Sequence, residues 1–175
     1  MLTLVVFDRL FTLIEWVKEM LLSPDTSSIL RPAKGDMNFH DKVFVSELNK
    51  QVDAAKTAYD KMLFKEALRT GFFEMQKARD KYRELCAGDG MRTDLVHRFI
   101  EWQAIVLSPI CPHVSEHLWS LLGKKGLLLK DTKWPKTGPV DENVINKSEY
   151  LMEAAREFRL KLKNYMQPPK AKKGA

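Results

Sequence analysis

The feature that most constrains the fold is a pair of prolines, Pro109 and Pro112, that follows a long apolar segment. Each proline lacks a backbone N–H and disfavours helix in the residue before it, so a helix that reaches this point must bend. Pro112 also suits the first turn of a new helix, where a missing N–H costs little. His113 and His117 then follow one helical turn apart, and Trp119 is expected to turn inward. The pattern predicts a helix, a proline corner and a second helix.

The rest of the chain is organised in segments whose apolar residues recur every three to four positions, the spacing of amphipathic helices. These segments are residues 4–21, a helix opened by Asn38 as N-cap, 61–86, 92–108, the helix after the corner and 148–166. Residues 23–37 and 123–147 are rich in loop-forming residues. We therefore predict an all-α bundle of about five or six helices over residues 1–166, followed by a basic Pro/Lys tail or linker at 167–175.

Three expectations about burial follow from the helical faces. Trp119 is predicted to be buried, whereas Phe73 points away from the apolar stripe of its helix and is either exposed or pressed against a second domain. The last helix is predicted to bury the residues of its own stripe, Leu151, Ala155, Phe158, Leu162 and Tyr165.

Composition favours a soluble protein of a reducing compartment. The 175 residues are 45% hydrophobic and 30% charged, which is ordinary for a globular domain with a core. Two cysteines supply no disulfide framework, which favours a cytoplasmic location. The apolar start lacks a basic n-region, and no apolar run approaches the roughly 20 residues of a membrane helix, so neither a signal peptide nor a membrane partner is expected.

The net charge of +6 is unevenly distributed. Residues 151–175 carry a net charge of +5 and residues 56–83 a net charge of +4. Localised positive charge is expected of a nucleic-acid-binding protein, although basic helices are also often solvated faces. The candidate phosphate-binding side chains, chosen from face and charge, are Lys65, Arg69, Arg83, Arg156, Arg159 and Lys163.

The segment Leu107–Trp119, the helix containing Phe64-Lys-Glu-Ala-Leu and the stretches around Trp134-Pro135 and Asn164-Tyr-Met166 resemble the tRNA-binding helical domain of class I aminoacyl-tRNA synthetases. The similarity covers roughly Arg9 to Met166. Many class I relatives carry two glutamates where this chain has Glu116-His117, and this departure favours the leucyl enzymes of the cytosolic (eukaryotic and archaeal) type.

The resemblance implies a tRNA-binding piece of a leucyl-tRNA synthetase, which is either a fragment or a truncated gene product. The parent enzyme would ligate leucine to its tRNA using ATP and Mg²⁺. The two ATP-binding signatures of the class, of the His-Ile-Gly-His and Lys-Met-Ser-Lys-Ser kinds, are absent from this sequence, so we assign it no catalytic residue and expect it to be inactive alone. The implied partners are leucine-accepting tRNA and the catalytic and C-terminal domains of the parent, with other synthetases as further candidates.

Three alternatives are open from the residues. The first is a free-standing tRNA- or RNA-binding module derived from a synthetase, and the second is a protein-interaction scaffold that uses Phe73 and the outer face of the first helix. The third is a metal site, because His113-Val-Ser-Glu-His117 matches the H-x-x-E-H pattern of inverted zinc peptidases, with Cys111 nearby. That pattern is short and lacks a recognisable third ligand, so we expect no metal. Cys111 as a nucleophile lacks an evident base.

Overall fold

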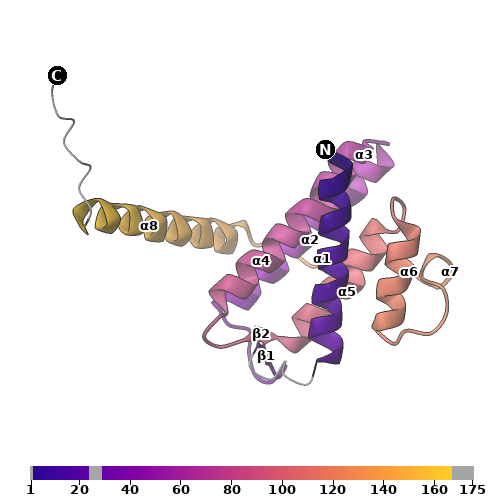
Figure 1. Ribbon diagram of the computed structural model, residues 1–175, viewed down its shortest axis with the longest axis horizontal. Helices are drawn as coiled ribbons and strands as arrows, with labels where there is room; N and C mark the ends of the chain where they lie inside the picture. The colour runs from indigo at the N-terminus through magenta and orange to yellow at the C-terminus, as the bar shows by residue number, and fades with distance from the viewer. Residues whose placement is uncertain (1, 24–28, 167–175) are drawn as a thin grey trace. The chain divides into compact units, whose positions relative to one another are not determined.

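The computed structural model describes residues 2–23 and 29–166, with side chains from Asp8 onward. The chain divides into two compact units, residues 1–140 and 141–175. Figure 1 shows the elements. In order they are α1 (Leu2–Leu22), β1 (Leu30–Arg31), α2 (Phe39–Asp60), α3 (Phe64–Leu68), the π-helical segment η2 (Arg69–Glu74), α4 (Met75–Leu85), β2 (Met91–Arg92), α5 (Thr93–Leu107), α6 (Pro112–Leu121), α7 (Leu128–Asp131) and, in the second unit, α8 (Glu142–Met166).

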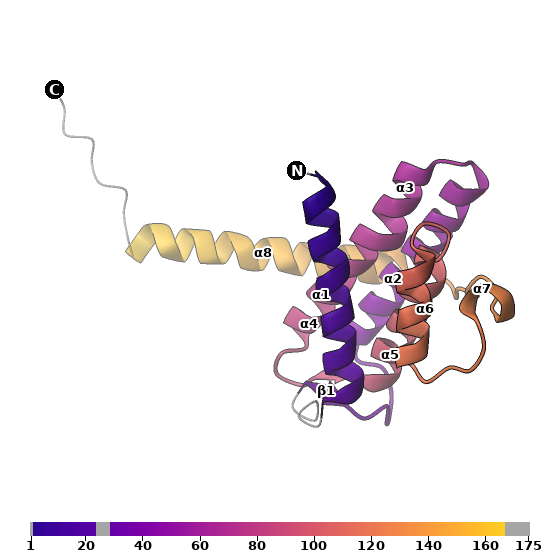
Figure 2. The ribbon, with the colours of Figure 1, turned by 45° about the vertical axis from the view of Figure 1, so that its right-hand side comes forward.

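The first unit is a helical bundle around one apolar core. Helix α2 packs against α3, η2, α4 and α5, while α6 packs against α1, α5 and α7 (Figures 1 and 2). Side chains that are at most 1% exposed fill the space between these helices, among them Val17, Leu48, Phe72, Phe99 and Leu118. The predicted all-α architecture is confirmed. The predicted tail at residues 167–175 lies outside the described residues.

Helix α2 begins at the N-cap that the sequence predicted. The Asn38 side chain accepts a hydrogen bond from the Asp41 backbone N–H at 2.8 Å, and the Asp41 carboxylate accepts one from the Asn38 N–H at 3.0 Å. This capping box satisfies two of the backbone donors that a helix leaves free at its start. Asp41 is fully buried, so its carboxylate needs further donors.

Those donors come from two segments that lie far apart in the sequence. Arg31 Nη2 donates to Asp41 Oδ1 at 2.6 Å, and the hydroxyl of Tyr82 donates to the same oxygen. The Tyr82 oxygen accepts a hydrogen bond from the Arg92 backbone N–H at 3.0 Å. Burial raises the pKa of Asp41, but the hydrogen bonds from Tyr82, Arg31 and Asn38 outweigh burial and hold the pKa below its ordinary value.

The same network holds a short sheet that the sequence analysis missed. Strand β1 pairs in parallel with β2, with Leu30 opposite Met91 and Arg31 opposite Arg92. The expectation that residues 23–37 form only a loop was therefore wrong for Leu30 and Arg31. Two residues are too few for an alternating pattern, so no periodicity in the sequence marks this strand.

The helix predicted over residues 61–86 is present from Phe64 to Leu85, but its middle segment, η2, is π-helical, which the sequence pattern did not predict. The widened turn frees the Gly71 carbonyl, which accepts a hydrogen bond from Gln103 Nε2 at 2.8 Å, and Gln76 donates to Gln103 at 3.2 Å. Gly71 itself is required by packing. A Cβ there would lie 2.6 Å from Val106 Cγ1 and 3.2 Å from the Cβ of Ala55. The absence of a side chain at Gly71 thus lets α5 approach η2 closely.

The proline corner has the predicted form. Helix α5 ends at Leu107, a turn follows, and α6 begins at Pro112. Leu118 and Trp119 turn into the core with 0% and 6% of their surface exposed, so the predicted burial of Trp119 is confirmed. Phe73, 36% exposed, points away from the core as predicted.

The second unit consists of one long helix, α8. The prediction that its apolar stripe is buried was wrong: Leu151, Ala155, Phe158, Leu162 and Tyr165 are all exposed. An amphipathic pattern requires an apolar surface to cover the stripe, and it does not say that the surface belongs to the same chain.

Candidate nucleic-acid interface

Two of the six predicted phosphate-binding residues lie where α3 passes into η2. Lys65 is exposed and has no carboxylate partner among the described residues. Arg69 is 56% exposed and donates to Glu66 one turn earlier, with Nη2 2.7 Å from Oε2. The hydrogen bond to Glu66 raises the pKa of Arg69 above its ordinary value. An exposed pair of this kind is worth little, so a phosphate can displace Glu66 at small cost.

Arg83, the third predicted residue, lies on α4 next to a small cavity. Its guanidinium is 55% exposed and 3.9 Å from Asp80 Oδ1, a long and weak pairing. The cavity has a volume of about 280 Å³, and its lining includes Arg83 itself and Glu19 together with apolar side chains such as Trp16 and Met91. The exposed guanidinium of Arg83 can therefore contact a phosphate, although the carboxylate of Glu19 on the same cavity opposes an anion there.

Other basic residues of this region are used inside the protein. Arg79 is 6% exposed, and its Cζ lies 4.5 Å from the ring centroid of Trp16. Burial lowers the pKa of Arg79 below its ordinary value, against the opposing effect of Asp80. Lys81 is half buried beside Glu47, with 2.6 Å between Nζ and Oε1. The net charge of residues 56–83 therefore overstates the charge available to a ligand.

The remaining three predicted residues lie on α8. Arg156 is exposed, with Glu153 at 3.9 Å, while Arg159 and Lys163 are exposed and have no ion-pair partner among the described residues. The structure therefore brings together Lys65 and Arg69 on one unit and the three α8 side chains on the other. It leaves Arg83 apart from Lys65 and Arg69, on α4 of the first unit.

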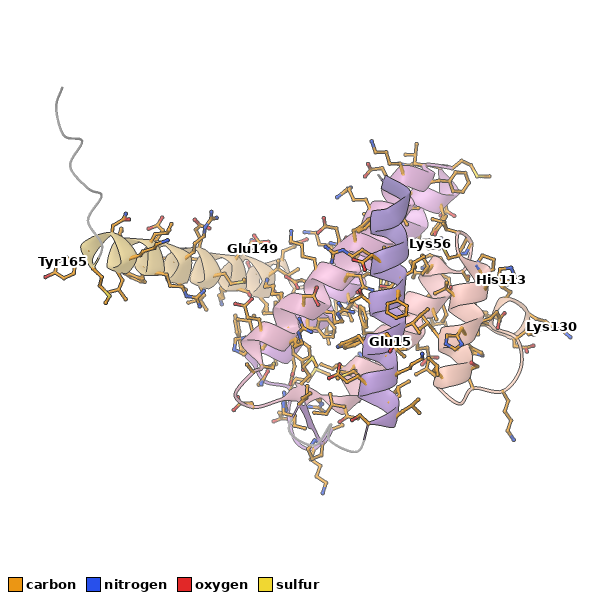
Figure 3. All side chains as sticks on the ribbon, viewed as in Figure 1. Glu15, Lys56, His113, Lys130, Glu149 and Tyr165 are labelled. Atoms are coloured by element: carbon orange, nitrogen blue, oxygen red, sulfur yellow. The ribbon has the colours of Figure 1, made fainter. Side chains whose placement is uncertain are left out.

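Sequence reasoning missed the lysines of the segment between α6 and α8. Residues 123–140 contain five lysines and one aspartate, a local excess that a charge count over this segment would have found. Lys124 pairs with Glu101 at 3.2 Å and lies over Trp119. The others are exposed without a carboxylate partner among the described residues, and Figure 3 shows Lys130 extending away from α7. They are Lys125, Lys130, Lys133 and Lys136.

The histidine motif after the proline corner has a structural use. The Glu116 carboxylate accepts hydrogen bonds from the backbone N–H groups of Leu128 at 3.0 Å and Leu129 at 3.3 Å, which caps α7. His113 and His117 lie on the exposed side of α6. Within residues 2–23 and 29–166, no group of three or more His, Cys, Asp or Glu side chains is arranged to hold a metal ion.

Neither cysteine has the surroundings of a nucleophile. Burial raises the pKa of the Cys86 thiol to about 11, and burial also raises the pKa of Cys111. The thiolate is the reactive form, so both groups are protonated and unreactive near neutral pH. The chemistry that the exposed residues offer is therefore the binding of anions. Across the described part of the chain, no helix has the length and apolar character needed to span a bilayer.

Comparison with known proteins agrees with this chemistry. The family described as the anticodon-binding domain of tRNA ligase matches residues 41–173, which include α8. The cytoplasmic leucine–tRNA ligase of Pongo abelii is 53% identical over 165 residues, and that of Dictyostelium discoideum is 38% identical over 158 residues. These matches cover 94% and 90% of this chain. The leucine–tRNA ligase of Aeropyrum pernix is 30% identical over 73% of the chain.

The chain is much shorter than these relatives. It spans 14% of the length of each of the three ligases. The resemblance to leucyl enzymes of the cytosolic (eukaryotic and archaeal) type is confirmed, since cytoplasmic leucine–tRNA ligases match at 53% and 38% identity and the Aeropyrum ligase matches more distantly at 30%.

Proposed function

Because the chain belongs to the family of tRNA ligase anticodon-binding domains and is similar to leucine–tRNA ligases, we propose that it binds leucine-accepting tRNA as part of such an enzyme. The observation that carries the proposal is the family match over residues 41–173, a region in which exposed basic side chains outnumber exposed acidic ones. The names of the relatives support a cytoplasmic location.

In this proposal the domain positions the tRNA and does not read its sequence. Lys65, Arg69 and Arg83 contact phosphates from the first unit, and the three basic side chains of α8 contact them from the second. Lys and Arg bind phosphate oxygens without regard to the base, so they fix orientation and register. The exposed lysines of residues 123–140 supply further basic side chains on the first unit that can contact phosphates. Selection of leucine tRNA over other tRNAs belongs to other parts of the enzyme.

The chemistry of the parent ligase lies outside this chain. ATP and Mg²⁺ activate the amino acid in such an enzyme, and the two signature motifs that hold ATP do not occur in the 175 residues. We therefore assign no residue of this chain to ATP, to Mg²⁺ or to the transfer of leucine. The catalytic and C-terminal domains of the parent are the partners that complete the enzyme.

The proposal is tested by fluorescence anisotropy with labelled leucine tRNA and an unrelated tRNA at low salt. We expect weak binding to both, with an affinity ratio below about threefold, since phosphate contacts carry no sequence information. Charge reversal of Lys65 and Arg69 to Glu weakens both complexes about equally. Reversal of Lys18, which is paired with Glu15 on α1, is the matched control and leaves both affinities nearly unchanged. Absence of binding to either tRNA at low salt contradicts the proposal.

A further inference from the structure

The exposed apolar residues of α8 have a regular spacing. Leu151, Ala155, Phe158, Leu162 and Tyr165 follow one another at alternating intervals of four and three residues, and we call these five residues the α8 seam. The a and d positions of a coiled coil are separated by the same alternating intervals, and at these positions the side chains of one helix insert between those of another. The seam is therefore shaped to meet a second helix along its length.

Nothing within α8 covers the seam. Phe158 is 70% exposed, Leu162 is 59% exposed and Tyr165 is 87% exposed, and Figure 3 shows Tyr165 projecting from the helix. Contiguous exposed apolar surface on a folded element marks an interaction site. The bulky side chains of Phe158 and Tyr165 have the character of interface anchors, which are often aromatic.

The charged residues at the edges of the seam are all basic, although Lys161 also pairs with Glu157 of the same helix, with 3.6 Å between Nζ and Oε2. One edge is formed by Met152, Arg159 and Met166, and the other by Lys147, Ala154 and Lys161. The acidic residues of this part of α8, Glu149, Glu153 and Glu157, lie at positions away from the seam. Residues at the edges of a coiled-coil seam select the partner by their charge. Basic edges favour a partner helix with acidic edges.

We propose that the α8 seam docks an amphipathic helix of a protein partner whose own apolar seam is bordered by Asp or Glu. This surface goes beyond the proposed tRNA binding, because phosphates leave Leu151 and Leu162 uncovered. A second copy of α8 is a poorer match than an acidic helix. It brings only basic and apolar residues to the edges and forms no ion pair with Arg159 or Lys161 there.

The experiment uses the full chain and two labelled helical peptides of about four heptads with Leu at a and d. One peptide has Glu at both edges, and the other has Lys. We expect the Glu peptide to bind roughly tenfold or more tightly than the Lys peptide in anisotropy titrations, since like charges across an interface are unfavourable. The Arg159→Glu, Lys161→Glu double variant inverts this preference. Equal affinity for the two peptides, or no binding of either, overturns the proposal.

A matched pair of substitutions separates the seam from general loss of apolar surface. Leu162 belongs to the seam, whereas Leu160, 51% exposed, faces away from it. Leu162→Ser weakens binding of the Glu peptide by about tenfold or more, and Leu160→Ser changes it by less than about twofold. Circular dichroism checks that both variants keep their helix. Equal losses in the two variants contradict the proposal.

Two further readouts distinguish the other occupants of the seam. Sedimentation showing a dimer of the chain that Leu162→Ser dissociates would overturn the proposal and assign the seam to a second copy. Loss of tRNA binding in Leu162→Ser, with peptide binding unchanged, would overturn it and assign the seam to RNA. Peptide binding that persists in a chain unable to bind tRNA leaves the docking proposal intact and removes the proposed function instead.

Discussion

The two units of this chain use similar amphipathic patterns in opposite ways. In residues 1–140 the apolar stripes meet one another, and several basic side chains are drawn into the interior, such as Arg31 beside Asp41 and Arg79 over Trp16. On α8 the apolar stripe and the basic residues are both exposed. The difference shows that an apolar stripe or an excess of basic residues does not by itself reveal whether a helix face is buried or exposed. That depends on which elements pack against the face.

We expect truncation of a large side chain to lower the free energy of unfolding by very different amounts in the two units. Trp119→Ala removes a side chain that is 6% exposed and packs in the core, so we expect the free energy of unfolding to fall by about 3–5 kcal/mol. Phe158→Ala on α8 removes an exposed ring and changes it by less than about 0.5 kcal/mol. Urea unfolding followed by circular dichroism measures both, and similar losses would show that α8 shares the core.

The next largest effect on stability is expected from replacing Asp41, the buried acid of the first unit. Asp41→Asn leaves Arg31 without its carboxylate, and we expect the free energy of unfolding to fall by about 2–4 kcal/mol near neutral pH. Because the pKa of Asp41 is lowered by folding, its contribution is complete above the unfolded-state value of about 3.9 and is lost as pH falls through the folded-state pKa.

The substitution should therefore flatten the acid limb of the curve of stability against pH, which urea unfolding at a series of pH values measures. The exposed Asp36→Asn serves as the control, with little change in stability at any pH. An Asp41→Asn protein that loses stability on acidification as steeply as the unsubstituted chain would contradict the assignment.

A smaller effect is expected from the close approach at η2. Gly71→Ala places a Cβ 2.6 Å from Val106 Cγ1, and overpacking of this kind costs about 1–3 kcal/mol. Gly88→Ala is the matched control, since nothing lies within 4 Å of its Cβ. Thermal unfolding compares them. If Gly71→Ala is as stable as Gly88→Ala, then η2 and α5 are less tightly packed than described.

The features that the sequence predicted are those with a local cause. The start of α2 at Asn38 follows from a cap, and the corner before α6 follows from Pro112. Burial of Trp119 follows from helical spacing within one short helix. Each of these depends on residues that are close together in the chain.

The features that were missed depend on residues far apart in the chain. The pairing of Arg31 with Arg92 joins strands that α2, α3, η2 and α4 separate in the sequence, and the widened turn at Gly71 exists because Gln103 and Val106 of α5 meet it there. The candidate interface was predicted only as a set of exposed charges. Some basic residues form ion pairs inside the protein, as Lys81 does with Glu47. Which residues are paired in this way depends on tertiary contacts that no local pattern contains.

If the basic residues left exposed on both units bind tRNA phosphates, then the affinity for tRNA must fall steeply as salt concentration rises. Each bound phosphate releases counterions, so the slope of log affinity against log salt counts the phosphates that the protein neutralises. We predict that Lys65→Glu with Arg69→Glu, and separately Arg159→Glu with Lys163→Glu, each lower the magnitude of this slope by roughly two, about one for each basic side chain replaced. A slope identical to that of the unsubstituted chain in both double variants would contradict the account.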